Sequence, residues 1–146
     1  MVPVHLAAML RLWSGSAGAA ATQGMDEMTD KAHLLGHGSD GVVTLTALGA
    51  RLLDAAHEHS SRRAAETITS GPSMRATVIA LVAGAELAEH ESPPAATLQV
   101  IVGQARLESA GNGWDVREGE VVAIPSERHA LSAITDAVIL LTVALR

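Results

Sequence analysis

The alternation of apolar and polar residues divides the chain into one helical segment followed by a series of short strands. The apolar residues of the first segment recur at three- and four-residue spacing: Leu45, Leu48, Leu52, Leu53 and Ala56. That spacing places them on one face of a helix. We therefore predict a helix over residues 44–58, with Thr44 or Thr46 as its N-terminal cap.

From residue 63 onward, β-branched and alternating runs replace the helical pattern. They predict strands over residues 64–69, 76–83, 97–102, 104–109, 114–116, 120–124, 129–134 and 137–145. Two of the separating turns are Ser70-Gly71-Pro72-Ser73 and Gly111-Asn112-Gly113. Short strands at this spacing predict an all-β barrel or sandwich. The last strand is apolar on both faces, so we expect the helix to cover one exposed side of the sheet.

Residues 1–41 differ in composition from the rest of the chain. The run from Ser14 to Gly24 consists mostly of small residues, which bury too little surface to offset chain entropy. We expect a disordered leader, or an upstream extension of a start at Met25 or Met28, and one folded domain over residues 42–146. Arg11 lies inside the first apolar segment, whereas a secretory signal carries its positive charge before that segment. No apolar run approaches the ~20 residues that span a bilayer, so we expect a cytoplasmic protein.

The amino-acid composition excludes several kinds of site and partner. The chain has no Cys, which excludes disulfides, thiolate metal sites and a cysteine nucleophile. It has no Phe or Tyr and a formal net charge of −6, and its one basic cluster is Arg62-Arg63. A nucleic-acid-binding protein needs a basic face for the phosphates, so DNA and RNA are not expected partners.

Two pairs of histidines have the spacing of possible metal ligands. His33 and His37 are four residues apart, but Gly36 and Gly38 oppose a helix there, so we interpret them as solvated loop residues. His57 and His59 flank Glu58 at the predicted helix end. Alternate helical residues point about 200° apart, so these two rings are not expected to bind one ion.

A different pair of histidines belongs to two longer motifs. Gly84 precedes His90 by five residues, with Gly103 beyond the next predicted strand. Gly119 precedes Pro125 by five residues, with His129 close behind. These motifs resemble those of the cupin superfamily, over residues 75–145. Residues 96–100 and 124–131 look like a group of small, uncharacterised bacterial cupins that carry a helix before the barrel. The resemblance implies an RmlC-like double-stranded β-helix, or jelly roll, in a cupin domain over residues 42–146.

The resemblance also implies where a metal would lie. Cupins usually bind it through two His and one Glu of the first motif and the His of the second. Here His90 and His129 match, but Ser92 occupies the position of the other His and Ala96 that of the Glu. The sequence therefore predicts a degenerate metal site, with His90 and His129 as the remaining candidate ligands for Fe, Mn or Zn.

Two functions follow from these residues. The first is a small-molecule-binding or sensing barrel, with His90, Ser92, Gln99 and His129 as the polar groups of an apolar pocket. The second is a metal-dependent oxygenase, isomerase or lyase that uses His90 and His129, or an enzyme that uses them as acid and base. Cupins commonly pair, so we expect a homodimer, which also hides exposed sheet edges.

Overall fold

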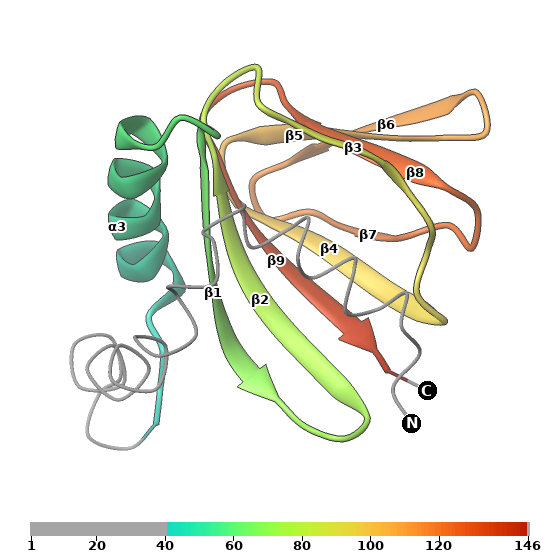
Figure 1. Ribbon diagram of the computed structural model, residues 1–146, viewed down its shortest axis with the longest axis horizontal. Helices are drawn as coiled ribbons and strands as arrows, with labels where there is room; N and C mark the ends of the chain where they lie inside the picture. The colour runs from blue at the N-terminus through green and yellow to red at the C-terminus, as the bar shows by residue number, and fades with distance from the viewer. Residues whose placement is uncertain (1–40, 146) are drawn as a thin grey trace.

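The computed structural model describes residues 41–145, except for the side chain of His90. The expectations for the leader, including His33 and His37, lie outside the described residues. Within them the chain forms one helix and two antiparallel sheets (Figure 1). The elements are α3 (Leu45–Glu58), β1 (Arg63–Ser70), β2 (Met74–Leu81), β3 (Glu86–His90), β4 (Ala95–Val102), β5 (Gln104–Ser109), β6 (Asn112–Arg117), β7 (Val121–Ala123), β8 (His129–Ala133) and β9 (Ala137–Ala144). The prediction of a mostly β domain with one preceding helix is confirmed.

The sheets have the strand orders β1-β2-β9-β4-β7 and β3-β8-β5-β6. Six short connections pass from one sheet to the other, and three of them, between β2 and β3, β4 and β5, and β8 and β9, meet at one end of the molecule. We call the end of the molecule that holds these three connections the turn end. The opposite end, where β3, β4, β8 and β9 have their other termini, is the distal end. The turn end is bound together by backbone hydrogen bonds, including Gly84 N to Ala133 O at 2.9 Å and Ile134 N to Gln104 O at 2.9 Å.

The core lies between the sheets. Alternate residues of each strand are buried there, as period-2 side-chain alternation requires. Its largest members are Ile79, Leu81, Leu87, Leu98, Val100, Leu107, Leu131, Ile139 and Leu141. We call the surface of each sheet that carries these side chains its inter-sheet face. Without Phe or Tyr, the core is filled by aliphatic residues, which pack well on pleated sheets.

Helix α3 covers the other face of the five-stranded sheet (Figure 1). Leu48 and Ala56 of the helix pack with Val78 and Val138 of the sheet in a second apolar cluster. This packing confirms that both faces of β9 are covered. The helix begins one residue later than predicted, because Thr44 occupies the cap position with extended backbone, and its side chain forms no capping hydrogen bond.

Two features of the four-stranded sheet differ from the sequence prediction. The β5–β6 turn is formed by Ala110 and Gly111, both at positive φ, so Asn112 pairs with Ser109 instead of belonging to the turn. Strand β3 was missed by the hydrophobic pattern, because Leu87 and Ala88 are its only apolar residues; the motif spacing alone marked it. Strand ends elsewhere differ from the prediction by at most two residues, and β5 has the predicted bounds.

The helix end is tied to the turn end by polar contacts. His57 Nε2 lies 2.7 Å from Asp136 Oδ2, and the backbone N–H of Ala83 donates to Asp136 Oδ1 at 2.9 Å. The hydrogen bond from Ala83 and then the one from His57 lower the pKa of Asp136 below its ordinary value. Arg62 donates from Nη2 to the Ala83 carbonyl at 2.7 Å. No helix among residues 41–145 is long and apolar enough to cross a membrane.

Candidate functional site

His129 is the first residue of β8 and lies on the inter-sheet face at the distal end. It shares that face with Leu131 and Ala133, which are core residues, and only 1% of its surface is exposed. Its Nδ1 is 3.2 Å from the carbonyl oxygen of Glu127. A carbonyl only accepts, so Nδ1 carries a proton in this contact.

His90 is the backbone partner of His129. The register pairs the two residues directly across β3 and β8, after a shift between Leu87 and His90. Residues far apart in the sequence are thus brought together at the distal end. The side chain of His90 lies outside the described part of the molecule, so the expected meeting of the two imidazoles stays a prediction.

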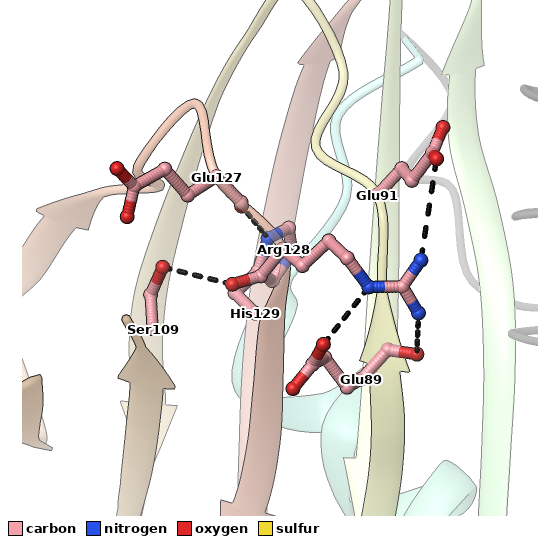
Figure 2. A network of polar contacts seen from close by, with 6 residues as sticks. All are labelled: Glu89, Glu91, Ser109, Glu127, Arg128 and His129. Carbon is pink, nitrogen blue, oxygen red and sulfur yellow. Dashed lines mark hydrogen bonds and ion pairs between the residues drawn. The ribbon is translucent and has the colours of Figure 1, made fainter. Parts of the chain in front are cut away.

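The same register extends across the whole four-stranded sheet. Ser109 of β5 pairs with His129, and Asn112 of β6 pairs with Ser109. Ser109 is buried, and its Oγ donates to the carbonyl oxygen of Arg128 at 2.9 Å (Figure 2). We call positions 90, 129, 109 and 112 the distal row. Sequence analysis missed Ser109 and Asn112, although the alternation of Ala105, Leu107 and Ser109 was a usable signal.

The next row on the inter-sheet face, toward the turn end, is apolar. It pairs Leu87, Leu131, Leu107 and Trp114 across the sheet. The first three are buried, whereas Trp114 is 37% exposed at the edge strand. The distal row is therefore a polar line directly bordering an aliphatic core. A small molecule that reached it would contact polar and apolar groups together.

The other two predicted pocket residues lie differently. Ser92, between β3 and β4, is half-buried, and its hydroxyl donates to the Pro93 carbonyl at 3.2 Å. Gln99 is half-buried on the opposite face of β4 from Leu98 and Val100, which are core residues. This placement corrects the expectation for Gln99, which does not line the inter-sheet face. The alternation of side chains along β4 decides on which face Gln99 lies. That alternation could not be counted from the sequence, because Pro93-Pro94 interrupts it.

The residues present do not fit the metal site that the cupin resemblance implies. Ala96 lies at the position of the carboxylate ligand, and its methyl group packs in the core. Within residues 41–145, excepting the His90 side chain, no group of three His, Cys, Asp or Glu could hold a metal ion. Catalytic zinc sites normally use three protein ligands, and two imidazoles alone bind a divalent ion weakly.

The histidines at the helix end have separate partners. His57 contacts Asp136, whereas His59 Nδ1 lies 2.7 Å from Ser61 Oγ. The two rings therefore contact different residues, Asp136 and Ser61.

The rim of the distal end is charged. Arg128 Nε donates to Glu89 Oε1 at 2.8 Å, and its Nη1 lies 4.0 Å from Glu91 Oε1 (Figure 2). All three side chains are more than half exposed, so water screens these pairs, and they contribute little to stability. Both glutamates project outward, so neither supplies the missing carboxylate to the inter-sheet face.

Comparison with known proteins supports the fold. No known protein family and no curated protein matches the chain by sequence. Solved structures do match. A conserved protein of unknown function from Streptococcus pyogenes is 26% identical with a TM-score of 0.56, over 60% of this chain and 78% of that one. A cupin superfamily protein from Desulfitobacterium hafniense is 13% identical with a TM-score of 0.55, over 57% and 78%.

A third match is an RmlC-like cupin protein from Desulfovibrio desulfuricans, 22% identical with a TM-score of 0.51, over 56% of this chain and 81% of that one. Identities this low establish architecture and leave function open. By its topology, its two antiparallel sheets and these matches, the chain has the RmlC-like cupin fold.

Proposed function

We propose that the chain is a small-molecule-binding or sensing barrel whose metal site has degenerated. The observation that carries the proposal is the burial of His129 at the distal end of the core, in register with His90 and Ser109. A buried imidazole among polar neighbours, bordered by aliphatic side chains, is the make-up of many ligand sites. Ala96, packed where a carboxylate ligand would lie, favours binding over metal chemistry.

The polar groups of the proposed site are His90, Ser92, Ser109 and His129. Gln99 is left out because it lies on the other face of β4. Binding would place the ligand beside His129, whose ring is oriented by the contact between its Nδ1 and the Glu127 carbonyl. Such a fixed ring recognises a ligand at little cost in side-chain entropy.

A thermal-shift screen of small metabolites tests this proposal. A ligand at 100 times its dissociation constant stabilises the folded protein by roughly 2.7 kcal/mol, which such a screen detects. We expect at least one compound to raise the unfolding midpoint and His129→Ala to abolish the shift. His57→Ala is the matched control, because His57 is half exposed and remote from the distal row. A screen without any hit, or a hit that His129→Ala leaves intact, would contradict the proposal.

A metal-dependent enzyme, an oxygenase, isomerase or lyase, is the second candidate. The pairing of positions 90 and 129 in one register favours it, since two imidazoles on adjacent strands are a partial ligand set. Elemental analysis of untagged protein separates the candidates. About one equivalent of metal, lost in His90→Ala, would favour the enzyme, whereas metal-free protein that still binds a small molecule would favour the barrel.

We also propose that the protein is a cytoplasmic homodimer without nucleic-acid partners. The sheets end in edge strands β1, β7, β3 and β6, and a two-fold pairing would cover such edges. Analytical ultracentrifugation at micromolar concentration tests the assembly, and a monomer there would refute it.

A further inference from the structure

The outer face of the five-stranded sheet, opposite its inter-sheet face, is only partly covered by helix α3. The helix packs mainly on β1 and β2, and its last turn contacts Asp136 at the turn end (Figure 1). Beyond the helix, the face continues across β9, β4 and β7. The strand register places six side chains there in two rows: Leu140, Gln99 and Val121, and Thr142, Thr97 and Ala123. We call these six residues the outer patch.

The outer patch carries no charged side chain, although the whole chain has a formal net charge of −6. Val121 is 62% exposed, and Thr97 and Ala123 are exposed as well. Met74, on the same face at the start of β2, is 43% exposed. Charged residues are depleted in the centre of interfaces, and exposed apolar patches mark surfaces that another segment covers. The outer patch therefore has the character of a docking surface.

The chain that precedes α3 reaches the sheet on this same side. Val43 and Leu45 pack in the apolar cluster between α3 and the sheet, and the first turn of α3 lies about 20 Å along the helix from the contact at Asp136. Residues 14–40 would link a segment docked on the outer patch to this point. A flexible linker of about that length spans roughly 30 Å, and it presents its segment at an effective concentration on the order of a millimolar.

Residues 2–13 have the pattern of an amphipathic helix. Large apolar residues recur in them at three- and four-residue spacing: Val2, Leu6, Met9, Leu10 and Trp13. Arg11 lies on the opposite side of such a helix, and Pro3 would lie in its first turn, where proline is tolerated. A helix this short is marginal in water, so it needs an apolar surface. The segment precedes the small-residue run on which the expectation of a disordered leader depends.

We infer that residues 2–13 dock as a helix on the outer patch, beside α3. Neither the apolar stripe of this segment nor the outer patch contains a charge, so their contact buries no unpaired ion. The small side chains of Thr97, Ala123 and Thr142 leave room for the larger residues of the stripe. The tether favours this segment over a second copy of the chain, which must bind from solution. The inference is independent of the proposed ligand-binding function.

Tryptophan fluorescence tests the docking, because Trp13 and Trp114 are the two tryptophans of the chain. In full-length Trp114→Phe protein, Trp13 should emit to the blue of free tryptophan and resist quenching by acrylamide. Adding Val121→Glu should place a charge in the contact, shift the emission to the red and remove the protection. Ile134→Glu is the matched control, because Ile134 is 45% exposed in the β8–β9 connection, and it should leave Trp13 unchanged.

Cross-linking tests the same contact with both tryptophans in place, because the chain has no cysteine of its own. Full-length protein with Met9→Cys and Gln99→Cys, treated with a short bis-maleimide, should give a cross-linked monomer. The matched control combines Met9→Cys with Arg106→Cys. Arg106 alternates along β5 with the core residues Ala105 and Leu107, so it lies on the outward face of the other sheet. We expect the first pair to react at least about tenfold faster than the control pair.

Several outcomes would overturn the inference. These are a Trp13 that is quenched as freely as in unfolded protein, protection that Val121→Glu leaves intact, and equal cross-linking of the two cysteine pairs. Protection that rises with protein concentration, or a cross-linked dimer in place of the monomer, would overturn it in favour of a second copy on the outer patch. Unfolding midpoints show whether the Val121→Glu variant is folded, and Gln99→Glu, which keeps the shape of the side chain, should repeat its effect.

Discussion

His57 Nε2 lies 2.7 Å from Asp136 Oδ2, which joins the last turn of α3 to the β8–β9 connection. The other oxygen of Asp136 accepts from the backbone N–H of Ala83 in the β2–β3 connection. One carboxylate thus links three segments that are far apart in the sequence. The two contacts are not equal, because the imidazole is 51% exposed and its pairing is screened by water.

Replacing Asp136 by Ala should therefore cost more than replacing His57. Asp136→Ala leaves the Ala83 N–H without its acceptor and should destabilise the fold by about 1 kcal/mol. His57→Ala removes only the exposed pair and should cost about 0.5 kcal/mol or less. Urea unfolding measures both. Equal losses would show that the helix contact, and not the backbone contact, gives Asp136 its importance.

Asp136 should also make stability depend on pH. Its pKa is lowered in the folded state, first by the Ala83 hydrogen bond and then by His57. A depressed folded pKa contributes stability above the unfolded pKa, and this stability is lost as pH falls through the folded value. The stability difference between wild type and Asp136→Ala should hold above about pH 5 and shrink below about pH 4. Urea midpoints across that range test this, and a difference that grows on acidification would contradict it.

Two glycines of the cupin-like motifs share a backbone conformation but differ in surroundings. Gly103 and Gly119 have φ of 80° and 83°. A Cβ on Gly103 would collide with the carbonyl oxygen of Asp136, whereas one on Gly119 would meet nothing within 4 Å. Gly119→Ala should cost about 1 kcal/mol from backbone strain alone, and Gly103→Ala about 3 kcal/mol or more. Thermal unfolding compares the two variants. Equal losses of stability would mean that the close approach of Gly103 to the Asp136 carbonyl is unimportant.

The sequence predicted the elements of the fold well because their periodicity reports burial directly. The apolar stripe of α3 and the two-faced pattern of β9 both described real contacts. The hydrophobic pattern did not predict strand β3, because its residues are mostly polar. The β5–β6 turn was placed one residue late, because Ala110 was not expected to adopt a positive φ.

The site was less predictable because it depends on register between strands. The motifs marked His90 and His129, and alternation marked the face of Ser109, but nothing local in the sequence sets the register that places Ser109 and Asn112 in their row. The prediction for Gln99 was wrong, because an error of one residue in counting along a strand moves a side chain to the other face of the sheet.

Gly49 and Val138 mark the closest approach of the helix to the sheet. A Cβ on Gly49 would lie 2.7 Å and 2.9 Å from the two methyl carbons of Val138, which is fully buried. Alanine gains about 1 kcal/mol in helix propensity but overpacks this contact by about 1–3 kcal/mol. We expect Gly49→Ala to destabilise the fold by about 1 kcal/mol. In a double-mutant cycle with Val138→Ala, the two changes should be less costly together than their sum, and strict additivity would contradict the contact.

The β5–β6 turn offers a change that should stabilise the protein. Ala110 has φ of 49° and Gly111 has φ of 78°, the conformation of a two-residue hairpin turn that favours Asn-Gly. Ala110→Asn should therefore raise the unfolding free energy by about 0.5–1 kcal/mol, since Asn adopts positive φ more easily than Ala. Ala123→Asn, at an exposed strand position, is the control and should be destabilising because Asn is disfavoured in strands. If urea unfolding showed both variants weakened alike, the turn would not be under strain at Ala110, and the pairing of Asn112 with Ser109 would have to be reconsidered.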